Sequence, residues 1–187
     1  WTRYMPSRVM LNELLASGVI GTPCMLTANL GYRIREKERL IRPELAGGAL
    51  LDVGVYTLNF ASMVFGMEIR KIDSSVSMTE TGVDAQESMT IHYEDGRMAV
   101  LNATIDGLSD RRGVIYGDKG FIEVENINNP QKLTVYDAGH RMIQELSCPE
   151  QVTGYEYEVL SCLDALEEGR IECQQMPHRD TVAMMEQ

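Results

Sequence analysis

Apolar residues recur every three or four positions in four stretches of the chain, which is the spacing of a helix with one buried face. These stretches are Pro6–Ser17, Ala49–Phe65, Tyr155–Glu168 and Arg179–Gln187. Ala49–Phe65 is apolar almost all round, and a helix of this kind is buried on every side, so it is predicted to form the centre of the core. The predicted buried face of Tyr155–Glu168 consists of Val159, Leu160, Leu163 and Leu166.

Between residues 72 and 146 apolar and polar residues alternate instead, which is the pattern of half-buried strands. A first strand is predicted over Cys24–Arg33, followed by a charged loop over Arg33–Glu44. The later strands are predicted at residues 72–78, Ser88–Tyr93, Met98–Thr104, Gly113–Tyr116, Phe121–Glu125, Lys132–Asp137 and Met142–Leu146. Strands joined by short turns pair antiparallel. The sequence therefore predicts one α+β domain, with a predominantly antiparallel open sheet and helices packed on one face.

The composition is that of a folded domain, with 44% apolar and 24% charged residues. Aspartate and glutamate number 28 against 17 lysines and arginines, for a net charge of −11. This balance argues against nucleic acid as a partner, because phosphate binding needs clustered positive charge. No apolar run approaches ~20 residues, so no membrane span is expected. No signal-peptide pattern opens the chain, so a cytoplasmic location is expected.

The four cysteines are Cys24, Cys148, Cys162 and Cys173, and no two of them have the spacing of metal ligands. Four reduced thiols and no metal site are therefore expected. The chain opens on Trp1 without an initiator methionine, which suggests a piece of a longer protein.

The 16 glycines include no two that are separated by a single residue. The G-x-G-x-x-G fingerprint that binds the pyrophosphate of a dinucleotide is therefore missing from this chain. The G-x-x-x-x-G-K-[ST] phosphate loop is missing as well. Any dinucleotide cofactor is expected to be held mainly by residues outside this sequence.

The segment AGGALLDVGVYTLNFASMVFG (Ala46–Gly66) resembles the signature helix of the Gfo/Idh/MocA family, the glucose–fructose oxidoreductase and inositol dehydrogenase group. The tyrosine at Tyr56, where other members have histidine, resembles the dihydrodiol and xylose dehydrogenase branch of that family. WTRYMP from Trp1, IYGDKGFIEV (Ile115–Val124) and GYEYEVLSCLDALEEG (Gly154–Gly169) extend the resemblance more weakly over nearly the whole chain.

This resemblance implies a protein of two domains, an N-terminal Rossmann domain that binds NADP or NAD and an α+β domain that follows it. Residues 1–187 then correspond to the second, substrate-binding and dimerisation domain, and the Rossmann domain is absent from this chain. The family's catalytic lysine, usually in a Glu-Lys-Pro motif, is expected upstream of Trp1.

The resemblance makes Tyr56 the general acid/base for hydride transfer between the nicotinamide and a carbinol carbon of a sugar or diol. Free tyrosine titrates near 10, so a phenolate near pH 7 needs about 4 kcal/mol of stabilisation, much of which a nearby lysine could supply. The alternative is a core tyrosine whose hydroxyl is satisfied. Asp52, one turn earlier, is the second catalytic candidate, or a carboxylate that the helix N-terminus favours.

Trp1, Tyr155 and Gly48 are predicted to bind substrate, and Arg3 and Arg39 to bind the cofactor. The alternatives are an anchoring aromatic residue for Trp1, a tight turn for Gly48 and solvated charges for the arginines.

Two classes of function fit the α+β fold. The first is the catalytic half of an NAD(P)-dependent sugar or diol dehydrogenase, inactive without the other domain. The second is a non-catalytic module that dimerises or binds a small ligand. In either case the uncovered face of the sheet predicts a homodimer formed through that face.

Overall fold

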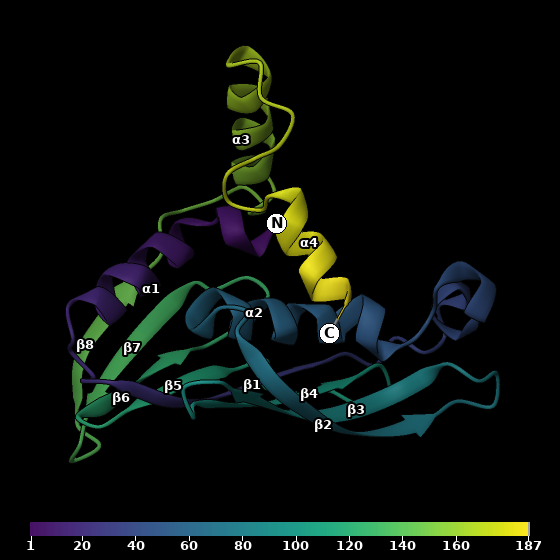
Figure 1. Cartoon of the computed structure of the whole chain (residues 1–187), viewed down its shortest axis with the longest axis horizontal. Helices are drawn as coiled ribbons and strands as arrows, with labels where there is room; N and C mark the ends of the chain where they lie inside the picture. The colour runs from purple at the N-terminus through teal and green to yellow at the C-terminus, as the bar shows by residue number, and fades with distance from the viewer. Residues whose placement is uncertain (187) are drawn as a thin grey trace.

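The computed structural model describes residues 1–186, and these form one eight-stranded sheet with its helices gathered on one face (Figure 1). The strand order is β2-β3-β4-β1-β5-β6-β7-β8. β1 and β4 pair in parallel, and the other neighbours pair antiparallel, which confirms the predicted fold class. The strands are β1 (Pro23–Gly31), β2 (Ile69–Met78), β3 (Asp84–Tyr93), β4 (Met98–Thr104), β5 (Gly113–Gly117), β6 (Gly120–Val124), β7 (Lys132–Asp137) and β8 (Met142–Ser147).

The helices include short 3-10 segments and one π-helical segment, η4, as well as α-helices. They are η1 (Thr2–Tyr4), α1 (Pro6–Ala16), η2 (Glu38–Ile41), η3 (Pro43–Leu45), η4 (Leu50–Gly54), α2 (Val55–Phe65), α3 (Glu156–Glu167) and α4 (His178–Met185). The predicted loop Arg33–Glu44 thus contains η2 and the start of η3. α4 confirms the last predicted helix as far as the described residues reach, and Gln187 lies outside them.

The core lies between the helices and the sheet, and cross-strand rows of apolar residues form its floor. Leu26 pairs with Ile115, Ile115 with Ile122, and Ile122 with Val135, and all four are 0% exposed. The period of two places every second residue of a strand on this face. α2 crosses above the row and contributes Phe60 and Ala61 to the same core.

The predicted central helix differs from expectation in its first turns. Leu50–Gly54 form a π-helix, and α2 proper begins at Val55. Leu50 and Leu51 are 38% and 45% exposed, so burial on every side is wrong for this end. Gly54 faces the sheet at this end and packs closely against Glu87 of β3, with the Leu50 side chain beside it.

α3 differs more. It stands away from the sheet (Figure 1), and its predicted buried face is exposed. Val159, Leu160, Leu163 and Leu166 are 54%, 56%, 50% and 73% exposed, whereas Ala165 is buried. The spacing of apolar residues correctly predicts the helix, but these residues find no partner in the part of the chain that the structure describes.

One segment, Pro43–Phe65, is long and apolar enough to cross a membrane by length and composition alone. The expectation that no segment reaches this length was therefore wrong. In this structure η4 and α2 pack against β1 and β4, and 56% of the segment's most apolar window is buried, as in the core helix of a folded domain.

Candidate functional site

Three of the predicted site residues meet at the N-terminal end of α2. The Trp1 indole Nε1 donates a hydrogen bond of 3.3 Å to the hydroxyl of Tyr56, which lies in the first turn of α2. The Trp1 ring packs on the ring of Tyr155, just before α3, with centroids 4.5 Å apart. Residues from both ends of the sequence are thereby brought to one place.

A glycine shapes the position of Trp1. Gly154 has a positive φ of +94°, a conformation that side chains rarely adopt. A Cβ atom at Gly154 would lie 2.7 Å from Cζ3 of the Trp1 ring. The indole therefore packs directly on the backbone that leads into α3.

Tyr56 is half-buried, and its surroundings favour the neutral phenol. Burial raises the pKa of Tyr56 above its ordinary value, the hydrogen bond from Trp1 lowers it, and Tyr155 and Asp52 raise it further. The net pKa is raised, so Tyr56 holds its proton at neutral pH in this chain. To accept a proton from a substrate it needs a positive charge supplied from outside the described residues.

Arg3 is bound on three sides by this chain. Its Nε donates to Asn59 at 2.6 Å, its Nη2 to Ser62 at 2.9 Å, and its Nη1 lies 2.7 Å from the Asp180 carboxylate. Its side chain is 11% exposed. Arg3 therefore ties η1 to α2 and α4, beside the Trp1–Tyr56 contact.

Arg39 and Asp52 form an ion pair. Nη2 of Arg39 lies 2.6 Å from Oδ1 of Asp52, and the pair joins η2 to the π-helical turn before Tyr56. Both arginines predicted to bind the cofactor are thus paired with carboxylates of the same chain. A dinucleotide phosphate would have to compete with Asp52 and Asp180, so these donors do not fit a phosphate site as they stand.

Gly48 is buried, with a φ of +119°. The Asp84 carboxylate occupies the place where a side chain would project, and it also accepts a 2.5 Å hydrogen bond from the backbone nitrogen of Leu50. Of the two interpretations, the geometry favours the tight turn, and a substrate role for Gly48 stays a prediction without a supporting contact.

A cavity of about 210 Å³ borders the Trp1–Tyr56 contact. It is lined in part by Arg3, Asn59 and Met184. Pockets for small ligands usually exceed about 300 Å³, so this cavity is part of a site rather than a whole one. Met184 of α4 was not predicted, because nothing in its local sequence marks it.

Tyr32 and Asn128 are further residues that the sequence did not single out. The Tyr32 hydroxyl accepts a 3.3 Å hydrogen bond from Asn128, and Tyr32 also raises the pKa of Tyr56. Oδ1 of Asn128 is buried and has no hydrogen-bond partner. These two polar groups lie on the loops that follow β1 and β6, and only the sheet topology places them close to the site.

A buried carboxyl group lies beneath the π-helical turn. Glu87 of β3 is 9% exposed and faces Gly54, with neither carboxylate oxygen in a hydrogen bond. Burial, together with the neighbouring Asp84, raises the pKa of Glu87 to about 8. The carboxyl group therefore stays protonated and uncharged near neutral pH.

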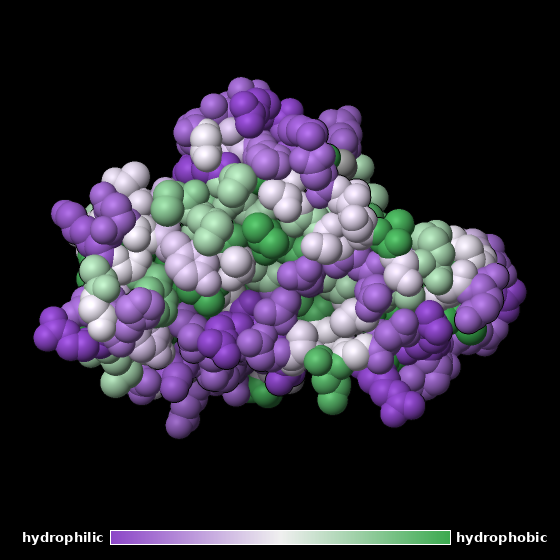
Figure 2. Space-filling model, turned by 90° about the horizontal axis from the view of Figure 1, so that it is seen from below, coloured by the Kyte–Doolittle hydropathy of each residue, from purple (hydrophilic) through white to green (hydrophobic). Residues whose placement is uncertain are grey.

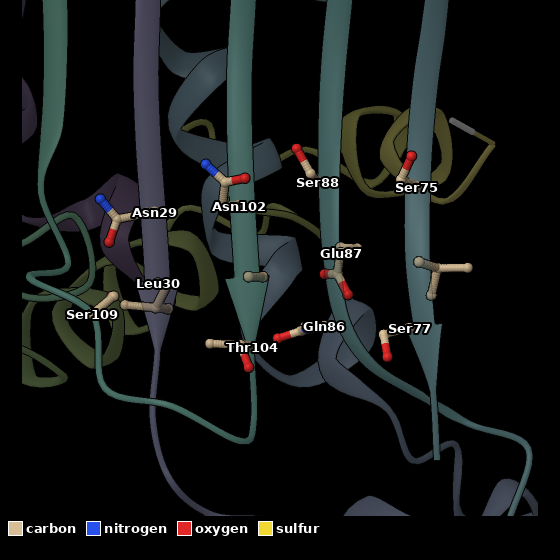
Figure 3. A pocket seen from close by; sticks show the side chains of 12 residues that line it. Asn29, Leu30, Ser75, Ser77, Gln86, Glu87, Ser88, Asn102, Thr104 and Ser109 are labelled. Atoms are coloured by element: carbon tan, nitrogen blue, oxygen red, sulfur yellow. The ribbon is translucent and has the colours of Figure 1, made fainter. Parts of the chain in front are cut away.

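The open face of the sheet carries a second, polar hollow of about 460 Å³ (Figure 3). Asn29, Asn102, Ser88 and Ser75 line it from four neighbouring strands. Figure 2 shows apolar and polar residues interspersed over this face. No predicted site residue reaches the hollow, so it is separate from the Tyr56 region.

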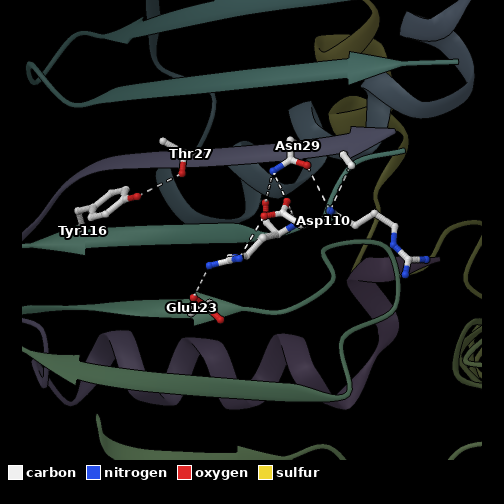
Figure 4. Close-up of polar contacts among 8 residues, drawn as sticks. Thr27, Asn29, Asp110, Tyr116 and Glu123 are labelled. Carbon is white, nitrogen blue, oxygen red and sulfur yellow. Dashed lines mark hydrogen bonds and ion pairs between the residues drawn. The ribbon is translucent and has the colours of Figure 1, made fainter. Parts of the chain in front are cut away.

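Beside this hollow a polar network fixes the loop before β5 (Figure 4). Asn29 donates to Asp110 at 2.7 Å and accepts from the Arg111 backbone nitrogen at 3.2 Å. Arg112 pairs with Asp110 at 3.2 Å and with Glu123 at 2.9 Å. Each charged group of this network except Arg111 has a partner of opposite charge, which indicates a structural role. Among residues 1–186 no group of three or more His, Cys, Asp or Glu side chains is arranged to hold a metal ion.

A family model described as the GFO/IDH/MocA C-terminal domain matches residues 9–123. The chain belongs to the Gfo/Idh/MocA family. Among curated Gfo/Idh/MocA relatives, the trans-1,2-dihydrobenzene-1,2-diol dehydrogenase of Xenopus tropicalis is 35% identical over 125 residues, which are 66% of this chain and 38% of that protein. The mouse enzyme of the same name is 31% identical over 136 residues, 72% of this chain and 41% of that protein. The chain thus spans less than half the length of these relatives.

Solved structures confirm the fold of a Gfo/Idh/MocA C-terminal domain. An aldose–aldose oxidoreductase from Caulobacter crescentus, complexed with glycerol, matches with a TM-score of 0.83 at 18% identity, over 99% of this chain and 57% of that one. KijD10, a 3-ketoreductase from Actinomadura kijaniata with NADP, matches with a TM-score of 0.85 at 16% identity, over 98% of this chain and 57% of that one.

Proposed function

We propose that this chain is the substrate-binding and dimerisation domain of an NAD(P)-dependent oxidoreductase that moves a hydride between a nicotinamide and a carbinol carbon of a sugar or diol. The observation that carries the proposal is Tyr56. It lies in the family's signature helix, half-buried, with its hydroxyl held by Trp1 at the edge of a cavity. The relatives named as diol dehydrogenases support the substrate class.

Tyr56 would serve as the general acid/base. In the oxidative direction its phenolate accepts the proton of the substrate hydroxyl as the hydride leaves the same carbon, and in the reductive direction its phenol returns that proton. The nicotinamide supplies the hydride chemistry, while the residues of this chain orient the substrate and move the proton. Asp52 would orient a substrate hydroxyl, and Trp1 and Tyr155 would provide an aromatic wall.

The cofactor would be bound mainly by an N-terminal Rossmann domain. The absence of a G-x-G-x-x-G fingerprint from this chain and the pairing of Arg3 and Arg39 with carboxylates both support this division. A lysine of that domain would supply the positive charge that is needed to lower the raised pKa of Tyr56 and stabilise its phenolate. This chain by itself would then not turn over substrate.

The test is an assay of the full-length protein with NAD and NADP against a panel of aldoses and trans-diols. Tyr56→Phe is expected to lose activity by about two to four orders of magnitude, the usual contribution of a positioned acid/base. Tyr93→Phe is the matched control, because it removes a buried hydroxyl that has no partner in a hydrogen bond. Equal activity in wild type and Tyr56→Phe would exclude Tyr56 from the proton transfer.

The second candidate is a non-catalytic module that dimerises or binds a small ligand. The uncovered face of the sheet supports the dimerisation in this candidate. We propose that this face forms a homodimer through Phe121, which stacks on Tyr136 at 4.7 Å and lies close to Tyr116 and His140. Light scattering of wild type should report a dimer and that of Phe121→Asp a monomer. Leu166→Asp on α3, 73% exposed, is the control that should leave the dimer intact. A wild-type monomer at high concentration would contradict the dimer.

A further inference from the structure

Two of the four cysteines lie against each other, far from Tyr56 in sequence. Sγ of Cys162, on α3, is 3.8 Å from Sγ of Cys173, on the segment that leads to α4. Eleven positions separate them in sequence. Cys24 and Cys148 make no such thiol contact within residues 1–186; Cys24 instead donates weakly to the Tyr116 carbonyl.

The surroundings of the pair distinguish the two sulfurs. A hydrogen bond from Ser161 lowers the pKa of the Cys173 thiol, and contacts with Cys162, Tyr4 and Arg170 lower it too. The contact with Cys173 raises the pKa of Cys162. Cys173 is therefore the sulfur that ionises first, with the Cys162 thiol as its hydrogen-bond donor, and the thiolate is the nucleophile in disulfide exchange.

The two cysteines differ in exposure, since Cys162 is exposed and Cys173 is 8% exposed. A cavity of about 530 Å³ opens beside Cys173, and Arg170 and Arg179 line it. Arg170 and Arg179 are paired with the carboxylates of Glu168 and Asp180, and Glu172 lines the same cavity, so the opening carries both charges. Its volume leaves room for one arm of a small disulfide such as oxidised glutathione.

We propose that Cys162 and Cys173 form a reversible intramolecular disulfide. The Cys173 thiolate attacks one sulfur of oxidised glutathione, forms a mixed disulfide and releases one glutathione thiolate, which takes up a proton. Cys162 then loses its proton, attacks the Cys173 sulfur and releases the second glutathione. Two protein thiols are oxidised, and one glutathione disulfide is reduced to two thiols. The sulfurs need to approach from 3.8 Å to about 2.05 Å.

The bond would tie α3 to the segment before α4, next to the substrate region. Cys173 contacts Tyr4, the neighbour of Arg3, and α4 carries the Asp180 that pairs with Arg3. α3 follows directly on Tyr155, which packs on Trp1. The proposal itself does not depend on the activity proposed above, because it concerns only the thiols.

The test is equilibration of the purified protein in glutathione buffers of increasing oxidised-to-reduced ratio. An acid quench, alkylation of the remaining thiols under denaturing conditions and peptide mass spectrometry then follow. We expect Cys162 and Cys173 to lose their free-thiol signal together and to appear as one linked pair without glutathione, restored by reductant. Cys24 and Cys148 should stay alkylatable at ratios that close the pair.

Single variants make the test sharper. Cys162→Ser should retain glutathione on Cys173, because the resolving thiol is gone, whereas Cys24→Ser should leave the linked pair unchanged. Glutathione adducts on wild-type Cys162 and Cys173 with no linked peptide at any ratio would overturn the proposal. Disulfide-linked dimers in place of the intramolecular bond would overturn it as well.

Discussion

The indole nitrogen of Trp1 lies 3.3 Å from the hydroxyl oxygen of Tyr56, although 55 positions separate the two residues. This hydrogen bond lowers the pKa of Tyr56, whereas burial raises it. Trp1 therefore orients the phenol and favours its ionised form, in addition to forming a wall with Tyr155.

The first prediction concerns Trp1→Phe. Phenylalanine keeps an aromatic ring against Tyr155 but removes the donor to Tyr56, so the pKa of Tyr56 should rise. A neutral hydrogen bond contributes about 1 kcal/mol, and a pKa change of one unit corresponds to 1.36 kcal/mol. The limb of the oxidative pH–rate profile that needs the phenolate should therefore move to higher pH by somewhat less than one unit. An unmoved limb, with lower activity at every pH, would mean that Trp1 acts by packing alone.

The second prediction uses Gly154→Ala. Both Gly154 and Gly169 have a positive φ, so alanine costs roughly 1–2 kcal/mol of stability at either position. The new methyl group at 154 also meets the Trp1 ring, whereas nothing lies within 4 Å at 169. The thermal unfolding temperature should fall in both variants, and further in Gly154→Ala because of the added contact with Trp1. The value of kcat/KM should fall markedly only in Gly154→Ala. Equal kcat/KM values would show that the position of Trp1 does not matter for turnover.

The third prediction tests whether Asp52 contributes to turnover in addition to its ion pair with Arg39. Asp52→Asn and Arg39→Gln each remove one charge of the 2.6 Å ion pair, and an ion pair this exposed contributes only about 0–1 kcal/mol. Both variants should therefore unfold within about 1 kcal/mol of wild type. If Asp52 orients substrate, Asp52→Asn should lower kcat/KM by about tenfold or more, and Arg39→Gln should not. A raised KM for the cofactor in Arg39→Gln alone would instead support the predicted role of Arg39 in cofactor binding.

Much of the fold could be predicted because its signals are local. The strands β4 (Met98–Thr104) and β7 (Lys132–Asp137) have the predicted bounds, since alternation and turn residues define them within a few positions. The parallel pairing of β1 with β4 was not predicted, because it joins segments more than 70 positions apart and leaves no local pattern. The exposure of α3 was missed for a related reason: apolar spacing predicts a helix but not whether a partner covers it.

In the candidate site, too, residues with a local sequence signal could be predicted, and residues brought in by contacts between distant segments could not. Tyr56, Trp1 and Tyr155 came from segments that resemble the family, and the structure brings these three together. Asn59 and Asp180, which hold Arg3, could not be found, because the contacts depend on where η1 lies relative to α2 and α4. Glu87 was not singled out either, because it lies just before the predicted strand Ser88–Tyr93, and the longer β3 together with the π-helical turn places it on the buried face.

The last prediction concerns this glutamate and the dependence of stability on pH. In the folded chain burial and Asp84 raise the pKa of Glu87 to about 8, whereas the pKa of an unperturbed glutamate is 4.5. Between these two pH values the folded state keeps a proton that the unfolded state has released. Rising pH therefore favours unfolding, and the free energy of unfolding should fall by up to about 1.4 kcal/mol for each pH unit, then level off above roughly pH 8.

Glu87→Gln cannot ionise, so this loss should disappear in the variant. Denaturant unfolding from pH 5 to pH 9 should give similar stabilities for wild type and Glu87→Gln at pH 5, and a clear advantage for the variant at pH 9. Glu80→Gln, at an exposed turn, removes the same charge without the burial and should follow wild type. Parallel curves for wild type and Glu87→Gln over the whole range would mean that Glu87 ionises at its ordinary pKa in the folded protein. The turn that carries Asp52 would then rest on a charged group instead of a neutral one.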